Sequence, residues 1–306
     1  MKKKILAIQG SSLKKINIKT DTSFFLGLEA QKRNYDIYYY EPKDLSFVDG
    51  KVIARCSQVK FQINLKKPIK ILKKCIINLI KAKILLIRNE PPFNQQYINT
   101  TFILEHIAKK IKIINDPKAL REVPEKLFSL RLTKFMPSTL ISEDLGEIKN
   151  FFAKNKKVVI KPIESYSGND VKLLNNFNKE QISKYIKKYH HLMLQKFIPQ
   201  ISKGDKRVFI IDGKVKGAIS RLPRKGSILS NMSKGASAKK IKMTYQEFKI
   251  SKIVAKELKR KKIYFAGIDF INEKLIGDIN VTSPTGLKTY YDLTGINLAE
   301  YFFNNI

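Results

Sequence analysis

Short apolar segments alternate with amphipathic ones along the first third of the chain, and this alternation restricts the fold more than any other sequence feature. The apolar segments have the length and composition of strands and lie at 4–8, 36–40, 51–54, 84–88 and 111–114. Helical spacing predicts helices over 22–33, 69–80 and 94–107. Strands that alternate with helices indicate a doubly wound, largely parallel sheet, whose ligands bind at the carboxyl ends of the strands.

A different pattern follows the proline-bounded segment 117–124, which we interpret as a boundary. Beyond it we expect helices at 125–136, 179–189 and 245–260, and strands at 158–161, 171–174, near 193, at 206–211 and at 214–221. The later strands indicate an antiparallel sheet with a helix packed on it, which is an α+β unit. Segment 223–240 has little periodicity, so we predict a long mobile loop there.

The chain has 306 residues, 43% of them hydrophobic, and a formal net charge of +34, so it can bury a sizeable core. Such charge raises the question of a nucleic-acid partner, but only nine of the 60 basic residues are Arg, and no nucleic-acid-binding motif accompanies them. We therefore do not expect nucleic-acid binding. No apolar run reaches the ~20 residues of a membrane helix, so we expect no membrane association.

Metal and disulfide frameworks based on cysteine are poorly supported by the sequence. The two cysteines, Cys56 and Cys75, lack CxxC spacing, and the chain has only three His. The start of the chain has a basic head but too short an apolar run for a signal peptide, and we interpret it as a first strand. These features predict a protein of the reducing cytoplasm.

The segment 264–285 places three oxygen-bearing side chains on two short strands. In a hairpin that turns at 273–274, Asp269 lies opposite Asp278, and Asn280 shares a face with Asp278. Magnesium takes few protein oxygens and completes its octahedron with water and phosphates, so this set suits magnesium-bound ATP. The alternative is a pair of solvated acids near a strand end.

A set of short motifs stands in order along nearly the whole chain: Asn17 to Phe24, Leu28 to Gln31, Arg88 to Phe93, Leu120-Arg121, Glu125 to Phe128, Val159 to Pro162, Gln195 to Pro199, Gly204 to Arg207 with Asp212-Gly213, Arg221 to Pro223, and Asp278 to Thr285. This ordered set resembles the prokaryotic glutathione synthetases of the ATP-grasp superfamily. The resemblance implies an amino-terminal α/β domain (1–122) on the substrate side, an ATP-grasp lid (123–199) and a carboxy-terminal ATP-grasp subdomain (200–306) that carries the mobile loop. Nucleotide is then held between the two ATP-grasp parts.

The resemblance also implies roles for individual residues in binding ATP, the co-substrate. Lys126 and Lys161 are expected to bind the phosphates, and Ser167 and Gly168 belong to the loop over them. Asp205 is expected to contact the ribose or to stabilise the hinge. The adenine edge is assigned to the strand at Gln195, Lys196, Phe197 and Ile198. Arg207 and Arg221 are the expected catalytic groups, because guanidinium forks match the oxygens of the transferred phosphoryl group. Asp269, Asp278 and Asn280 are the expected ligands of Mg²⁺, with Mn²⁺ as an alternative.

For the acceptor, the resemblance implies γ-glutamylcysteine as the carboxylate that is phosphorylated and glycine as the amine that attacks it. The expected substrate contacts are Asp21, Ser23, Arg88, Ser283, Pro284 and Thr285. Asp21 and Ser23 have an alternative role as caps of the first helix. Arg88 begins a loop whose double proline excludes regular structure. The family also implies a homo-oligomer.

Three departures from the family pattern bear on activity. The phosphate loop, usually rich in glycine, keeps only Gly168, and the mobile loop has Leu229-Ser230-Asn231 where the family has Arg-Gly-Asn. We consider Arg224, Lys225 and Lys234 as substitutes for that missing charge. Asp278 replaces a Glu and is shorter by about 1.5 Å, in a hairpin one residue longer than usual.

Three functions therefore remain open at this point. The leading one is ATP-dependent ligation of γ-glutamylcysteine and glycine to glutathione through an acyl phosphate. The second is an ATP-grasp carboxylate-amine ligase with a different acceptor. The third is a weakly active nucleotide-binding homologue.

Overall fold

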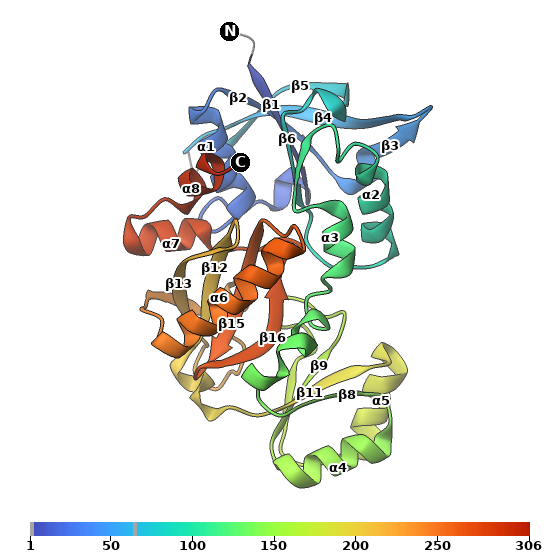
Figure 1. Cartoon of the computed structure of the whole chain (residues 1–306), viewed down its shortest axis with the longest axis vertical. Helices are drawn as coiled ribbons and strands as arrows, with labels where there is room; N and C mark the ends of the chain where they lie inside the picture. Colours follow the sequence, from blue (N-terminus) through green and yellow to red (C-terminus); the bar gives the residue numbers. More distant parts are fainter. Residues whose placement is uncertain (1–2, 64–65) are drawn as a thin grey trace.

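The computed structural model describes residues 3–63 and 66–306, which form three sheets (Figure 1). A seven-stranded sheet belongs to the amino-terminal part, a four-stranded sheet to the middle part and a five-stranded sheet to the carboxy-terminal part. In Figure 1 the last of these lies between the other two. Among the described residues, no helix is both long and apolar enough to cross a lipid bilayer.

The first sheet has a parallel centre, as the sequence predicts. Strands β2 (Tyr35–Tyr40), β1 (Lys4–Gly10), β6 (Ile84–Arg88) and β7 (Lys112–Ile114) pair in that order, all parallel. Alternate residues of β1 point to opposite faces of the sheet. Leu6 and Ile8 therefore pack with helix α1 (Thr22–Lys32), and Ala7 belongs to the hydrophobic cluster on the other face, which includes helix α2 (Gln95–Glu105). Both faces are covered, as in a doubly wound sheet.

The helix predicted over 69–80 is wrong, because this segment is strand β5 (Ile69–Asn78). It pairs antiparallel with β4 (Lys51–Phe61), which also pairs with β3 (Leu45–Val48) and β2. Half of the apolar residues of β5 are exposed and the others are only partly buried, so burial of a helical face does not decide its conformation. The ladder of backbone hydrogen bonds with β4 does. The sheet is consequently mixed, with a parallel centre and an antiparallel extension.

The middle unit is a four-stranded antiparallel sheet covered by two helices. Its strands are β8 (Thr139–Ser142), β9 (Val158–Pro162), β10 (Lys172–Leu174) and β11 (Leu192–Lys196), and its helices are α4 (Leu145–Asn155) and α5 (Lys179–Tyr189). The segment leading into it holds α3 (Pro117–Glu122) and a 3-10 helix over Phe128–Phe135 with a kink at Leu132. The helix predicted over 125–136 is thus a shorter, irregular one.

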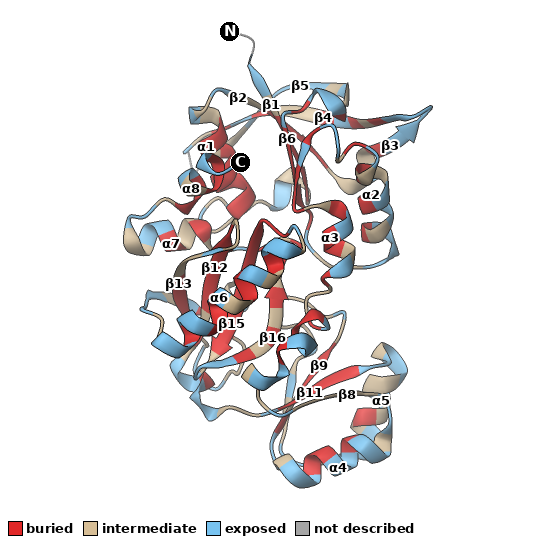
Figure 2. Cartoon of the chain, viewed as in Figure 1, coloured by how far each residue is buried: buried red, intermediate tan, exposed pale blue. Residues whose placement is uncertain are grey.

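The third unit is the predicted antiparallel sheet with one long helix on it. Strands β12 (Asp205–Ile211), β13 (Lys214–Leu222), β15 (Phe265–Ile271) and β16 (Lys274–Asn280) carry α6 (Tyr245–Arg260), which turns its apolar face to the sheet (Figure 2). The predicted mobile loop 223–240 contains a fifth strand, β14 (Ser237–Lys240), which pairs with β13. Helices α7 (Leu287–Thr294) and α8 (Leu298–Asn304) pack back against α1.

Helix α1 approaches the first sheet closely at Gly27. A Cβ atom at this position would lie 2.2 Å from a ring carbon of Phe61, which is itself buried in the core. Gln31 fixes the same contact, since its side chain accepts a hydrogen bond from the Phe61 N–H (2.7 Å) and donates one to the Phe61 carbonyl (2.9 Å). The ring cannot retreat without breaking this packing.

We predict that Gly27→Ala lowers the free energy of unfolding by about 1–3 kcal/mol through overpacking. Gly146→Ala in α4 is the matched control, because its nearest neighbour is the Asp144 carboxylate at 3.1 Å and alanine favours a helix. Urea unfolding followed by circular dichroism measures both. Equal stability of the two variants would contradict the close packing of α1 on Phe61.

Candidate active site

A cavity of about 470 Å³ lies where the three units meet, and most of the predicted site residues line it. The lining includes Asp21, Lys126, Lys161, Ser167, Gly168, Gln195, Lys196, Phe197, Ile198, Asp205, Arg207, Arg221, Asp269, Asp278, Asn280, Ser283 and Thr285. The remaining three predicted residues, Ser23, Arg88 and Pro284, are not among its lining residues. Residues as far apart in the sequence as Asp21 and Thr285 therefore line one cavity.

Two aspartates and two arginines alternate along the wall of this cavity. Arg207 donates two hydrogen bonds to Asp269, from Nε to Oδ1 at 2.8 Å and from Nη2 to Oδ2 at 2.7 Å. Arg221 donates from Nη2 to the same Oδ2 at 3.0 Å and forms a second two-point contact with Asp205, 2.8 Å from its Nε. These four side chains, the Asp–Arg ladder, are all buried.

Asp269 and Arg221 keep their charges despite burial, whereas burial raises the pKa of Asp205. Burial alone raises the pKa of Asp269, but Arg207 and Arg221 outweigh it and hold that pKa well below its usual range. Burial lowers the pKa of Arg221, and the carboxylates of Asp205 and Asp269 raise it further than burial lowers it. Two full guanidinium charges therefore stand beside the cavity, as a site for phosphate oxygens requires.

Strand β16 contributes the second carboxylate, on a bulge. Ile268 pairs with Ile279 and Phe270 with Leu275, so three residues of β16 (276–278) lie opposite one residue of β15, Asp269. The irregularity contains Gly277, whose φ of +85° suits glycine, and Asp278. The turn itself lies at residues 272–273, one position earlier than predicted.

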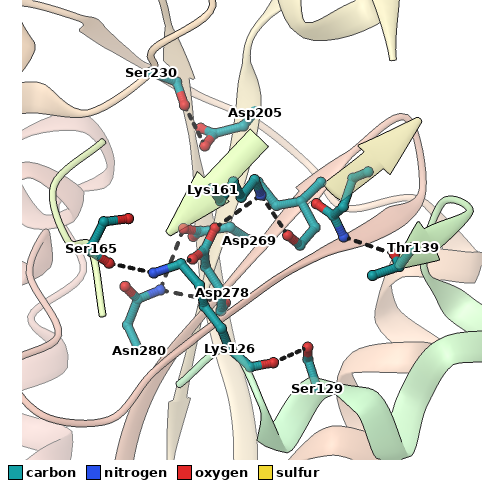
Figure 3. Close-up of polar contacts among 12 residues, drawn as sticks. Lys126, Ser129, Thr139, Lys161, Ser165, Asp205, Ser230, Asp269, Asp278 and Asn280 are labelled. Atoms are coloured by element: carbon teal, nitrogen blue, oxygen red, sulfur yellow. Dashed lines mark hydrogen bonds and ion pairs between the residues drawn. The ribbon is translucent and has the colours of Figure 1, made fainter. Parts of the chain in front are cut away.

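Two lysines point at Asp278 from other elements (Figure 3). Lys161 Nζ from β9 lies 3.4 Å from Oδ2, and Lys126 Nζ lies 3.9 Å from Oδ1. Both ammonium groups are also bonded to backbone carbonyls, Lys161 to Ile276 at 2.8 Å and Lys126 to Ser165 and Ile163. Burial lowers the pKa of Lys126, although Asp278 opposes this shift. A multiply charged anion would relieve that cost of burial.

The donor set fits a hard divalent cation. Asp278 is partly exposed, and Asn280 donates from Nδ2 to the Gly267 carbonyl (3.0 Å) and, at 3.4 Å, to Asp269. Among the described residues no donor reaches the Asn280 Oδ1, which leaves it available as a ligand. Two carboxylates and one amide oxygen, with the remaining positions open to water and phosphate, match magnesium coordination. Within residues 3–63 and 66–306, no group of three or more Asp, Glu, His or Cys is placed to hold a metal ion, so this site depends on the Asn280 amide as well.

An apolar surface adjoins the strand predicted to read adenine. Val159, Phe197, Ile198 and Ile276 line the cavity there. The N–H groups of Lys196 and Phe197 already donate to the carbonyls of Ser138 (2.9 Å) and Lys157 (3.0 Å). The Ile198 N–H has no acceptor among the described residues, so it is the backbone donor that this strand offers to a ligand.

The phosphate loop and the mobile loop meet over the cavity. The Ser230 hydroxyl donates to Asp205 (2.5 Å), and Lys234 Nζ donates to the Asn169 side chain (2.7 Å). Gly168 packs so closely on the Asn231 side chain that a Cβ would lie 2.7 Å from its oxygen. Arg224, Lys225 and Lys234, the considered substitutes for the missing loop charge, are not among the lining residues.

The substrate-side residues form two layers. Asp21 lines the cavity and also caps α1, accepting from the Phe24 N–H at 2.7 Å, so both of its predicted roles are compatible. Arg88 lies behind the wall, donating to the Ser23 hydroxyl (3.2 Å) and the Pro284 carbonyl (2.8 Å). Its buried guanidinium joins the end of β6 to the segment after β16.

Glu125, which precedes Lys126, lines the cavity and was not predicted as a site residue. Its Oε1 accepts three hydrogen bonds, from the N–H groups of Val281 (2.9 Å) and Thr282 (3.1 Å) and from the Thr282 hydroxyl (2.8 Å). Thr282 and the apolar stretch 228–229 of the mobile loop also line the cavity. The only sequence signal for Glu125 was its place in the motif that contains Lys126.

Comparisons with known proteins cover the whole chain. The family model described as prokaryotic glutathione synthetase, N-terminal domain, matches residues 5–121, and the model of its ATP-grasp domain matches residues 125–295. Glutathione synthetase of Mesorhizobium japonicum is 33% identical, covering 100% of this chain and 98% of the relative. The enzyme of Buchnera aphidicola subsp. Schizaphis graminum is 35% identical, covering 98% and 97%.

Solved structures of lower identity share the fold. D-cycloserine synthetase DcsG superposes with a TM-score of 0.69 at 13% identity, covering 98% of this chain and 97% of the other. D-alanyl-alanine synthetase A of Vibrio cholerae gives 0.63 at 12% identity, covering 99% and 97%. The fold is therefore that of the ATP-grasp ligases, and the matched family models and full-length relatives place this chain in the prokaryotic glutathione synthetase family.

Proposed function

We propose that this protein joins γ-glutamylcysteine to glycine at the expense of ATP, forming glutathione, ADP and phosphate. The observation that carries the proposal is the convergence of Lys126, Lys161, Arg207 and Arg221 with Asp269, Asp278 and Asn280 on one cavity. Four cations gathered around two carboxylates and an amide suit a magnesium-bound polyphosphate. Family membership supports the choice of substrates.

The nucleotide is proposed to lie between the middle and carboxy-terminal units. Its base packs on the apolar surface at Val159 and Ile276 and accepts a hydrogen bond from the Ile198 N–H. Its phosphates reach Lys126 and Lys161, whose compact charges bind phosphate without demanding one geometry. Gly168 and the loop above it cover the phosphates and exclude water.

Arg207 and Arg221 are proposed to stabilise the charge that develops during transfer. The acceptor carboxylate attacks the γ-phosphorus, the bond to the β,γ-bridging oxygen breaks, and ADP and an acyl phosphate result. The glycine amine then attacks the acyl carbon, phosphate leaves with the C–O bonding electrons, and the amine loses a proton. Because Asp205 and Asp269 fix both guanidinium groups in advance, little reorganisation is needed when charge develops.

Asp269, Asp278 and Asn280 would hold Mg²⁺, with Mn²⁺ as the other candidate. The bound cation supplies neutralisation of the phosphate oxygens. Asp278 sits on the β16 bulge, which gives this shorter side chain a backbone position that a regular strand would not provide. We propose that the bulge offsets the shorter reach of Asp278.

The substrate dipeptide is proposed to occupy the part of the cavity next to the first domain. Asp21 and Glu125 offer carboxylates there to an ammonium group, and Ser283 and Thr285 offer hydroxyl groups. Arg88 supports this wall from behind through Ser23 and Pro284. We further propose a homo-oligomer, which family membership supports. We also propose a cytoplasmic location, with which the free thiols of Cys56 and Cys75 agree.

Coupled detection of ADP tests the proposed function. With ATP, Mg²⁺, γ-glutamylcysteine and glycine we expect continuous ADP release and a product with the mass of glutathione. Omitting glycine should reduce the rate to that of slow acyl-phosphate hydrolysis. Nucleotide binding without turnover would instead favour a weakly active homologue, and turnover only with another amine would favour a changed acceptor.

Asp278→Asn removes one charge at nearly constant shape and tests the second carboxylate. We predict that it lowers kcat about 100-fold or more, because one misplaced or missing group at the phosphates costs this much. Asp212→Asn is the matched control, since Asp212 carries a surface ion pair with Lys259 and does not line the cavity. Unchanged turnover of Asp278→Asn would contradict the proposal that Asp278 is a metal ligand.

Asp269→Asn tests the Asp–Arg ladder through stability. The pKa of Asp269 in the fold lies below its value of about 3.9 in the unfolded chain, so its charge stabilises the fold above about pH 4. That contribution is lost as the pH falls toward the folded pKa. We predict a loss of about 3–5 kcal/mol in the variant at pH 7, shrinking as the pH is lowered from 5 to 2.5. Guanidinium unfolding at each pH measures this, and a pH-independent difference would contradict it.

A further inference from the structure

Asn115 stands at the junction between the first domain and the hairpin β15–β16. It follows β7 directly and is 4% exposed. Its Nδ2 donates to the carbonyls of Phe265 (2.8 Å) and Val281 (2.7 Å), and its Oδ1 accepts from the N–H groups of Tyr264 and Phe265 (both 2.9 Å). A primary amide has two donor hydrogens and two acceptor lone pairs, and this one uses all four.

The four bonds hold both strands of the hairpin at one end. Phe265 is the first residue of β15, four residues before Asp269, and Tyr264 precedes it, while Val281 directly follows Asn280 at the end of β16. The side chain thus ties together the two chain segments that deliver the proposed metal ligands. No other side chain among the described residues contacts both segments through four hydrogen bonds.

A second tie acts on β16 from the neighbouring linker. The Glu125 carbonyl accepts a bond from the Ile279 N–H (3.2 Å), and its carboxylate holds Val281 and Thr282. Both neighbours of Asn280 are therefore held by hydrogen bonds. Ile279 and Val281 bond to Glu125, and Val281 also bonds to Asn115. Glu125 itself lines the cavity, whereas Asn115 does not.

We propose that Asn115 is a positioning residue for phosphoryl transfer, which sets the place of Asp278 and Asn280 by fixing the hairpin to the amino-terminal domain. The proposal rests on the proposed function of the cavity. Asn115 does not line the cavity, so a nucleotide or substrate bound there would not touch it. It acts through the hairpin, in the way that outer-shell hydrogen bonds orient metal ligands.

Asn115→Asp separates this role from simple stability. The carboxylate can still accept from the N–H groups of Tyr264 and Phe265, but it can donate to neither the Phe265 nor the Val281 carbonyl. The β16 side therefore loses its only bond to residue 115, while the β15 side keeps two of its three. Asn297→Asp is the matched control. Asn297 caps α8 by accepting from Ala299 and Glu300 and donates to Glu29, so the same exchange removes one donor far from the hairpin.

Two measurements report on positioning. Calorimetric titration with ADP, with and without Mg²⁺, gives the gain in nucleotide affinity that Mg²⁺ provides. We expect Asn115→Asp to reduce this gain about 10- to 100-fold, with little change in affinity for metal-free ADP, and to lower kcat by a similar factor. Asn297→Asp should lose about as much thermal stability as Asn115→Asp. It should nevertheless leave kcat and the Mg²⁺-dependent gain in ADP affinity unchanged. An unchanged magnesium-dependent gain in Asn115→Asp would overturn the proposal.

A double-mutant cycle with Asp278→Asn adds a second test. If Asn115 acts through the metal ligands, Asn115→Asp should lower kcat less than threefold further in the Asp278→Asn background. If the two residues act independently, their effects on kcat would multiply. Multiplying effects would overturn the proposal, and so would failure of Asn115→Asp and of the milder Asn115→Ser to fold. If the wild-type protein binds ADP with Mg²⁺ but releases no ADP from ATP, the proposed function fails while the titrations still decide the role of Asn115.

Discussion

The buried Asp–Arg ladder is the constraint on which the rest of the site depends. Two guanidinium groups can be kept charged away from water only if carboxylates meet them at short range, and Asp205 and Asp269 do so from neighbouring strands. The same pairing aims the arginines at the cavity and fixes the mobile loop, because Ser230 bonds to Asp205. Stability and the placement of phosphate-binding charge are therefore achieved by one set of contacts.

The hairpin β15–β16 connects this ladder with the other two units. It carries Asp269 in the ladder, Asp278 opposite the lysines of the middle unit, and its ends are bonded to Asn115 and Glu125. Each unit thus supplies a part of the site that is incomplete alone. A ligand bound there contacts all three units, so binding is expected to stabilise their relative placement.

Much of this arrangement could be predicted from the sequence, and the failures have physical causes. The alternation of strands and helices predicted the parallel centre, and helices 179–189 and 245–260 were placed at their observed bounds because they are long and periodic. Strand β5 was missed because none of its apolar residues is fully buried, so its pattern does not mark one buried face; pairing with β4 decides its conformation. Asn115 and Glu125 could not be identified, because their partners lie about 150 residues away and a polar side chain gives no periodic signal of its contacts. The hairpin that carries Asp269 and Asp278 was predicted, but its register was not, because the turn lies one position earlier and a bulge in β16 is not visible in the alternation of residues.

The central claim is that the hairpin β15–β16 and the Asp–Arg ladder hold a metal-bound nucleotide. A crystal structure with Mn²⁺ and a non-hydrolysable ATP analogue, with anomalous scattering to locate the metal, tests this most directly. We predict Mn²⁺ at ligand distance, about 2.1 Å, from oxygens of Asp269, Asp278 and Asn280, with the phosphates against Lys126 and Lys161. A nucleotide bound outside this cavity, or a metal bound to the phosphates without contact to the hairpin, would contradict it.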